Sequence, residues 1–280
     1  MSYVNIQDRR LPFALRYLGD LMAYRHLCWN LVGSDLRARF RRTKLGILWA
    51  IIQPLTFALL IAAVWGSLAR TANYWEFALY VFVGHVGFDL FTTAMGDGQD
   101  AIAKARGFVM QARIPFFIFQ VRVMLTGIVM FAFALMGAIG FAVAIGHPPP
   151  LGLNLLLVPA FAGVALLFCL PIAMIMSIIG SQFRDVRHIS QLVERAIFMV
   201  SPVMLPREIL GQPQLEFMQY VNPIVPFLDM LRAPLMGDWK TGEFFWETQD
   251  VIVMSAWIAG LWTLAFLSAA SSGRKLVFAI

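Results

Sequence analysis

The stretch that decides the fold is residues 36–66, LRARFRRTKLGILWAIIQPLTFALLIAAVWG. Five of its first nine residues are cations: Arg37, Arg39, Arg41, Arg42 and Lys44. The apolar run that follows from Leu45 is long enough for a bilayer-spanning helix, which needs about 20 predominantly apolar residues. Because Lys and Arg beside a span are retained on the cytoplasmic side, this stretch predicts a membrane helix that begins at the cytoplasmic face.

The composition of the whole chain indicates an integral membrane protein. Of the 280 residues, 60% are hydrophobic and 14% are charged, whereas a soluble domain has about 25% charged residues. The formal net charge of +6 would suggest a nucleic-acid partner in a soluble protein. Here the cations gather before Leu45 with no folded basic domain around them. We therefore interpret them as a topology signal, and we expect no nucleic acid as a partner.

Apolar runs of spanning length recur along the chain. We predict six transmembrane helices, over residues 45–68, 75–95, 115–145, 151–179, 189–205 and 251–270. The fifth run is the weakest, because Glu194 and Arg195 interrupt it. The second and fourth loops are richer in cations than the loops between them, which predicts that both termini lie in the cytoplasm.

Three further segments are neither spans nor plain loops. Residues 11–32 carry apolar side chains at helical spacing and predict an amphipathic helix in the cytoplasmic interface. Residues 100–112 predict a short cytoplasmic helix. Residues 206–239 are too short and too proline-broken to span, and they predict short re-entrant helices at the outer face. The predicted fold class is therefore an all-α polytopic membrane protein, with a cytoplasmic tail over residues 1–44 and a transmembrane domain over residues 45–280.

The sequence lacks the motifs of a reaction centre. The four histidines have no metal-ligand spacing, the two cysteines form no framework, and a phosphate loop for ATP is missing. We therefore expect no catalytic activity, no metal and no cofactor on this chain. Asp89 and Arg122 lie inside predicted spans, where ionisable residues are functional candidates. Asp89 is expected either to pair with a cation or to face a water-filled path. Arg122 is expected either to have such a functional role or to extend its side chain to the cytoplasmic surface.

Aromatic side chains cluster near the ends of the first two predicted spans. They favour either of two interpretations, an aromatic belt in the headgroup zone or a path along which sugar rings slide over aromatic faces. The candidate conduit aromatics are Trp49, Trp65, Trp75, Phe77, Tyr80 and Phe88.

Several motifs, in order along the chain, resemble the membrane subunit of bacterial type-2 ABC exporters, in the branch that moves polysaccharides and polyol phosphates. The basic run with Phe40, then Leu45, Gly46, Trp49 and Pro54, is similar to the start of that family. Similar elements are VMQARIP (residues 109–115), FRDVRHI (183–189), SPVM (201–204) and VNPIVPFLDMLRAPLMG (221–237). The chain departs from the family where a basic residue commonly precedes the proline, because Ile114 stands there.

The resemblance implies a permease that exports a lipid-linked polysaccharide (O-antigen, capsule or teichoic acid) across the bacterial cytoplasmic membrane. It implies a homodimer in contact with membrane lipids and with two copies of a separate ATPase that carries ATP and Mg. The residues that would couple to the ATPase are Ala105, Arg106, Phe108, Val109, Gln111, Arg113, Arg184, Asp185 and Arg187. An outer gate would use Ser201, Pro202, Asn222, Pro223 and Arg232. Three cations either hold the lipid phosphate of the substrate or only anchor the topology: Arg39, Arg41 and Arg42.

Other functions stay open on the sequence alone. A type-2 permease for a small lipid or a drug would share the same motifs. A membrane enzyme acting on polyprenyl-linked sugars would need a carboxylate cluster at the inner face, but Asp8, Asp20 and Asp35 are scattered. A purely structural scaffold leaves the outer segment over residues 206–239 without a purpose.

Overall fold

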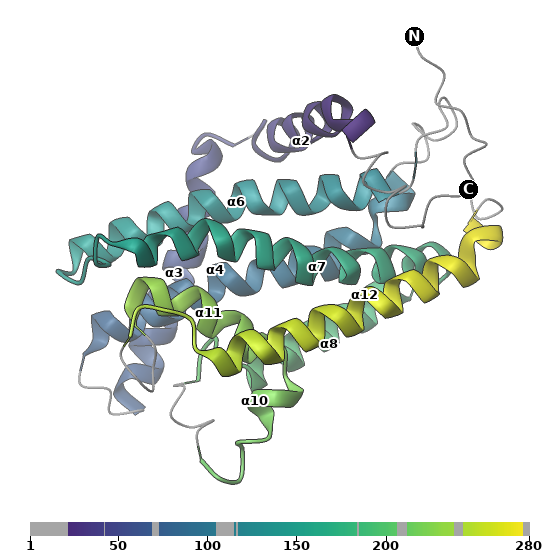
Figure 1. Cartoon of the computed structure of the whole chain (residues 1–280). Helices are drawn as coiled ribbons and strands as arrows, with labels where there is room; N and C mark the ends of the chain where they lie inside the picture. The colour runs from purple at the N-terminus through teal and green to yellow at the C-terminus, as the bar shows by residue number, and fades with distance from the viewer. Residues whose placement is uncertain are drawn as a thin grey trace.

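The computed structural model describes residues 22–41, 43–68, 73–104, 115, 117–183, 185–205, 212–237 and 243–276. Within these ranges the chain is helical and has no strand, as the predicted all-α class requires. The long helices run side by side (Figure 1). In chain order the helices are α2 (Arg25–Phe40), α3 (Trp49–Leu68), α4 (Tyr74–Gln99), α6 (Phe117–Ala144), α7 (Leu157–Gln182), α8 (Val186–Val200), α10 (Met218–Val221), α11 (Ile224–Met236) and α12 (Thr248–Leu276). Two 3₁₀ turns, Gly46–Leu48 and Leu153–Leu156, precede α3 and α7.

Five helices among the described residues are long and apolar enough to cross a bilayer. They cover Gly46–Trp65, Tyr74–Gln99, Phe117–Ala144, Leu153–Gln182 and Thr248–Ser271. Five of the six predicted spans are thereby confirmed as helices of spanning length. The reason is local, since a run of about 20 apolar residues in a bilayer must satisfy its backbone hydrogen bonds internally.

The predicted fifth span is the exception, so the described part of the chain contains five such helices where the sequence predicted six. The helix at that place, α8, has 15 residues, which at 1.5 Å per residue is about 22 Å, shorter than the hydrocarbon core of about 30 Å. Glu194 and Arg195 also lower its hydropathy. After Val200 the backbone turns extended at Ser201, with φ −92° and ψ 157°, and the helix ends.

The central element is α4, which is largely buried and contacts α3, α6, α7, α8 and α11. Small residues permit these close approaches, as is common between membrane helices. A Cβ placed on Gly98 would come within 2.9 Å of the Cα of Ala173 in α7. A Cβ on Gly180 would come within 2.8 Å of the carbonyl oxygen of Gln99. The end of α4 is therefore held tightly against α7.

Residues 25–32 of the helix predicted over residues 11–32 lie in α2, which continues to Phe40; residues 11–21 are outside the described ranges. Its buried face, with Cys28, Leu31 and Val32, packs against α6 and the last residues of the α4 segment. Trp29, an apolar residue of the same predicted helix, is exposed. The face that meets α6 follows positions 28, 31, 32 and 35, so position 29 points about 100° away from Cys28.

The short helix α11 enters the bundle instead of crossing it. It has 13 residues, and all of those from Ile224 to Leu235 are buried. It packs on α4, α7 and α12, as a short re-entrant helix would. The predicted outer segment also includes residues 206–211 and 238–242, which are outside the described ranges.

Cations gather at one end of the bundle, which we name the basic end. Here α4 and α7 end and α6 and α8 begin, and the cations are Lys104, Arg122 and Arg187. The last turns of α12 lie at the same end as the start of α6 (Figure 1).

Candidate functional site

A polar groove runs between α2, α3, α4 and α6 from the basic end toward the middle of α4. Two adjoining cavities form it, of about 290 Å³ and about 190 Å³. Arg39, Thr93 and Gly127 line both cavities, so the two are continuous. We name them the basic-end cavity and the mid-depth cavity.

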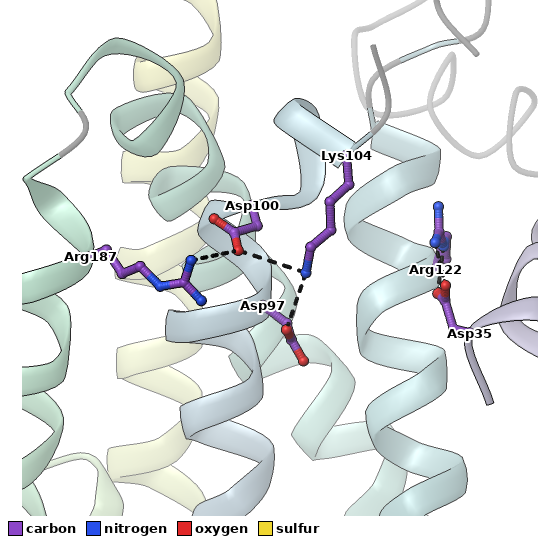
Figure 2. Close-up of polar contacts among 6 residues, drawn as sticks. All are labelled: Asp35, Asp97, Asp100, Lys104, Arg122 and Arg187. Atoms are coloured by element: carbon purple, nitrogen blue, oxygen red, sulfur yellow. Dashed lines mark hydrogen bonds and ion pairs between the residues drawn. The ribbon is translucent and has the colours of Figure 1, made fainter. Parts of the chain in front are cut away.

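Five charged side chains line the basic-end cavity. They are Asp35 and Arg39 of α2, Asp97 of α4, Arg122 of α6, and Lys104, which follows α4. Arg122 of α6 forms a two-pronged ion pair with Asp35 of α2. Its Nε donates to Oδ2 of Asp35 at 2.6 Å, and its Nη2 donates to Oδ1 (Figure 2). Planar two-pronged pairs of this kind are strong and geometrically specific. The pair therefore holds α2 against α6.

A second set of ion pairs lies where α4 ends. The Nζ of Lys104 lies 3.5 Å from a carboxylate oxygen of Asp97 and 3.7 Å from one of Asp100. The same Oδ2 of Asp100 lies 3.5 Å from Nη1 of Arg187, which belongs to α8 (Figure 2). Beside them the buried Ser190 hydroxyl donates to Oε1 of Gln99 at 3.3 Å. The end of α4 and the start of α8 are thus joined by polar contacts.

The mid-depth cavity contains a carboxylate at a depth where hydrocarbon surrounds the bundle. Asp89 lies ten residues before the end of α4, about 15 Å along the helix, and its side chain is 52% exposed. The hydroxyls of Thr92 and Thr93 donate to its backbone oxygen, not to its carboxylate. The nearest basic nitrogen among the described residues is Nε2 of His85, at 3.8 Å.

A carboxylate in that position has an energetic cost. Placing an aspartate at the centre of a membrane helix costs about 3 kcal/mol on insertion scales, and such residues face a bundle interior or a water-filled cavity. Other polar side chains line the same cavity, among them Gln53 and Thr92, with Arg39 at its border with the basic-end cavity. The groove is therefore a path lined by polar side chains from the basic end to about the middle of α4.

The predicted coupling residues lie mostly outside the described ranges. Those outside are Ala105, Arg106, Phe108, Val109, Gln111, Arg113 and Arg184. Lys104, which directly precedes this segment, carries the contacts to Asp97 and Asp100. Asp185 directly precedes α8, and its backbone oxygen accepts from the amide of His188 at 3.0 Å. Arg187 binds Asp100 as described, and the coupling roles stay predictions.

The three cations predicted to meet a lipid phosphate are not equivalent. Arg39 lines both cavities and is exposed. Arg41 follows the end of α2, is exposed, and does not line either cavity. Arg42 is outside the described ranges. Only Arg39 is thus placed by the described structure at the groove.

The six candidate conduit aromatics also separate. Trp49 lines the mid-depth cavity, and Trp65 and Trp75 are exposed on the bundle surface. Phe77 and Phe88 are buried among side chains of the same chain. Tyr80 belongs to the contacts around α11.

The predicted outer-gate residues come together around α11. The guanidinium of Arg232 lies over the Tyr80 ring, 3.5 Å from its centroid, and Nη2 donates to the Tyr80 carbonyl at 3.0 Å. The Tyr80 hydroxyl donates to the carbonyl of Leu205 at 3.0 Å. Asn222 donates to the Ser201 hydroxyl at 2.9 Å, and its side-chain oxygen accepts from the amide of Ile224, the first residue of α11, at 3.0 Å.

Two proline positions of the predicted gate sit beside these contacts. Pro202 is buried next to Ser201, and Pro223 is the residue before α11, where a fixed φ suits the start of a helix. We name Tyr80, Ser201, Asn222 and Arg232 the Arg232 cluster. It fastens α11 and the turn after α8 to α4.

Sequence reasoning missed several residues of the groove and the basic end. Asp35, Asp97, Asp100 and Gln53 carried no local signal, since each resembles an ordinary interfacial or loop residue. Asp89 was detectable because it interrupts an apolar run. No cluster of three metal-ligating side chains occurs in the part of the chain that the structure describes, and the groove residues suit binding of a polar solute.

Comparison with known proteins matches the region that builds the groove and the Arg232 cluster. The O-antigen export system permease protein RfbA of Myxococcus xanthus is 28% identical over 220 residues, which cover 78% of this chain and 84% of RfbA. The polysialic acid transport protein KpsM of Escherichia coli is 22% identical over 204 residues, 72% of this chain and 78% of KpsM. The family model described as ABC-2 type transporter matches residues 26–236, from α2 to the end of α11. The chain therefore belongs to the ABC-2 type transporter family and is the membrane subunit of a transporter.

Proposed function

We propose that this chain is the permease subunit of an exporter that carries a lipid-linked polysaccharide across the bacterial cytoplasmic membrane. Family membership supports a transporter subunit, and the names of RfbA (O-antigen export) and KpsM (polysialic acid transport) support a polysaccharide as the transported compound. The observation that carries the proposal is the polar groove, which leads from the basic end to the depth of Asp89.

The physical problem of such a transporter is the hydration of sugars. Each polar group that enters hydrocarbon without a hydrogen-bond partner costs several kcal/mol. Gln53, Asp89 and Thr92 offer replacement partners at depth. A permease for a small lipid or drug would need an apolar cleft, so the polar lining favours a glycan over these alternatives.

Arg39 is the residue best suited to receive the lipid phosphate. Of the cations in the basic-end cavity, Arg122 is paired with Asp35 and Lys104 with Asp97 and Asp100. Arg39 has no ion pair with any of the described residues. Its planar guanidinium matches phosphate oxygens. The phosphate would therefore be held at the point where the two cavities meet.

A second copy of the chain would close the passage. Helices α3, α4 and α8 adjoin, since His85 of α4 stacks on Phe57 at 4.5 Å and meets Phe198 edge-on at 6.3 Å. These three helices expose polar side chains that lipid tails cannot satisfy: Gln53, Thr56, Asp89, Gln191 and Arg195. We place the partner copy against them, with the passage between the two copies.

A separate ATPase would drive the cycle from the basic end. We assign this end to the cytoplasm because its cations would be retained there. Both termini would then be cytoplasmic, because α8 begins at this end, α12 ends at it, and the chain crosses once more between them through α8 and the residues that follow. ATP and Mg would be bound by that ATPase, two copies of which would serve the dimer. Closure of the ATPase would push the segment after Lys104 and the start of α8.

The test is transport by the assembled complex. The chain is purified with its ATPase, reconstituted in vesicles containing polyprenyl-linked glycan, and assayed for ATP-dependent glycan movement. Arg39→Ala should reduce transport at least tenfold and Arg39→Lys less, because lysine keeps the charge, while the matched control Arg41→Ala should retain it. The proposal would be overturned by a purified particle that contains one copy of the chain and recruits no ATPase. It would also be overturned if the rate of ATP hydrolysis did not depend on the glycan.

A further inference from the structure

We propose that the mid-depth cavity is a sugar-binding subsite, in which the Asp89 carboxylate accepts hydrogen bonds from sugar hydroxyls and Trp49 packs against the ring. The proposal rests on the proposed function, because it says where the glycan is held on its way through. It concerns a different position from Arg39, which would hold the phosphate.

The unused hydrogen-bonding capacity of Asp89 is the first argument. Its carboxylate accepts none of the hydrogen bonds that the described residues donate. His85, at 3.8 Å, is beyond hydrogen-bond distance. The half-exposed Asp89 carboxylate lines the groove. At this depth its hydrogen-bond donors would have to come from a solute or from water.

The other lining residues supply the complementary groups. Gln53 has an amide that both donates and accepts, and Thr92 has a hydroxyl. Polyhydroxyl compounds are donors and acceptors at once, so they match this set. Trp49 and Met130 form part of the apolar wall of the same cavity. The C–H face of a sugar ring is apolar and fits against such a wall, and an indole ring offers a large contact area.

The charges of the cavity distinguish a sugar from a phosphate. Arg39 lies at the border with the basic-end cavity and Asp89 lines only the mid-depth cavity. A phosphate drawn to Arg39 would be repelled by the carboxylate if it moved further. A neutral sugar meets no such barrier. The order along the groove is therefore phosphate at Arg39 and sugar at Asp89.

Protection of an introduced thiol tests the subsite in the working transporter. Gln53→Cys is made in a background of Cys28→Ala and Cys169→Ala, and cells are labelled with membrane-permeant N-ethylmaleimide. Labelling is compared between cells that make the glycan and cells that lack its first glycosyltransferase. We expect labelling of Q53C to fall at least threefold when the glycan is made. Thr56→Cys, which is exposed one turn along α3 but does not line the cavity, should be labelled equally in both.

Substitution of Asp89 completes the test. Asp89→Leu should abolish the protection of Q53C, and Asp89→Asn, which retains an acceptor of the same shape, should preserve part of it. Equal labelling with and without glycan, or protection that persists in the D89L variant, would overturn the subsite. Labelling that is blocked in both cell types would also overturn it, because a protein surface would then cover the cavity. Export is measured in the same cells: if it does not depend on this chain, the proposed function fails, whereas export with unprotected Q53C removes only the subsite.

Discussion

The carboxylate of Asp100 lies 3.5 Å from the guanidinium of Arg187, and this contact joins the end of α4 to the start of α8 (Figure 2). The same carboxylate oxygen lies 3.7 Å from Lys104. Lys104 and Arg187 belong to the two segments that we expect to meet the ATPase. A displacement of either segment would therefore be transmitted to the other through the Asp100 side chain.

We predict that Asp100→Asn weakens the coupling of ATP hydrolysis to transport. Exposed ion pairs are worth about 0–1 kcal/mol, so the unfolding temperature should change little. The measured quantity is ATP hydrolysed per glycan exported in the reconstituted complex, which should rise severalfold. Asp97→Asn is the matched control, because Asp97 contacts Lys104 but not Arg187. An unchanged ratio in D100N would rule out a coupling role for Asp100.

We predict that Arg122→Met loosens α2. The loss of a charged hydrogen-bonded partner costs about 2 kcal/mol, which corresponds to about a 30-fold change in the docking equilibrium. Cys28 is buried on the face of α2 that packs against α6, and burial raises the pKa of its thiol above the usual range, an effect that the Arg122 charge partly offsets. Undocking exposes Cys28 and returns its pKa toward the ordinary value, so the thiolate fraction at pH 7 to 8 increases. Maleimide labelling of Cys28 should therefore accelerate.

The paired replacement is the control for α2. Asp35→Leu combined with Arg122→Met removes both charges, so no unpaired carboxylate remains, and labelling of Cys28 should slow again toward the wild-type rate. Labelling that is equally fast in the single and double variants would show that the ion pair does not hold α2.

We predict that Gly87→Ala destabilises the packing of α11 against α4. A Cβ at this position would lie 2.8 Å from Cδ2 of both Leu228 and Leu231, and overpacking of this kind costs about 1–3 kcal/mol. The measurement is the thermal unfolding midpoint of the protein in detergent. Gly140→Ala in α6 is the matched control, since a Cβ there meets no atom within 4 Å among the described residues. Equal midpoints for the two variants would contradict the close approach of α11 to α4.

We predict that the hydrogen bond and the ring of Tyr80 contribute separately to the Arg232 cluster. Tyr80→Phe removes the bond to the Leu205 carbonyl and should cost about 1 kcal/mol. Tyr80→Leu also removes the ring beneath Arg232 and should cost about 1 kcal/mol more. Denaturant unfolding in detergent measures both. If Y80F and Y80L were equally stable, the cation–π contact would contribute nothing.

The sequence by itself determined the elements that depend on local composition. Five spanning helices follow from runs of about 20 apolar residues, because hydrocarbon leaves the backbone no other way to satisfy its hydrogen bonds. The prolines over residues 206–239 likewise predicted short helices, and Asp89 was recognisable because it interrupts an apolar run. These features need no knowledge of what lies beside them.

The tertiary structure alone decided which side chains meet. Arg122 and Asp35 are 87 positions apart, and no local pattern relates them. Phe88 and Trp49 are equally aromatic in sequence, yet Phe88 is buried in the core and Trp49 lines a cavity, because the neighbours of a helix face depend on how the helices pack. The length of α8 depended on the turn at Ser201, which its contact with Asn222 holds. Local runs set the helices, whereas contacts between distant segments set the groove.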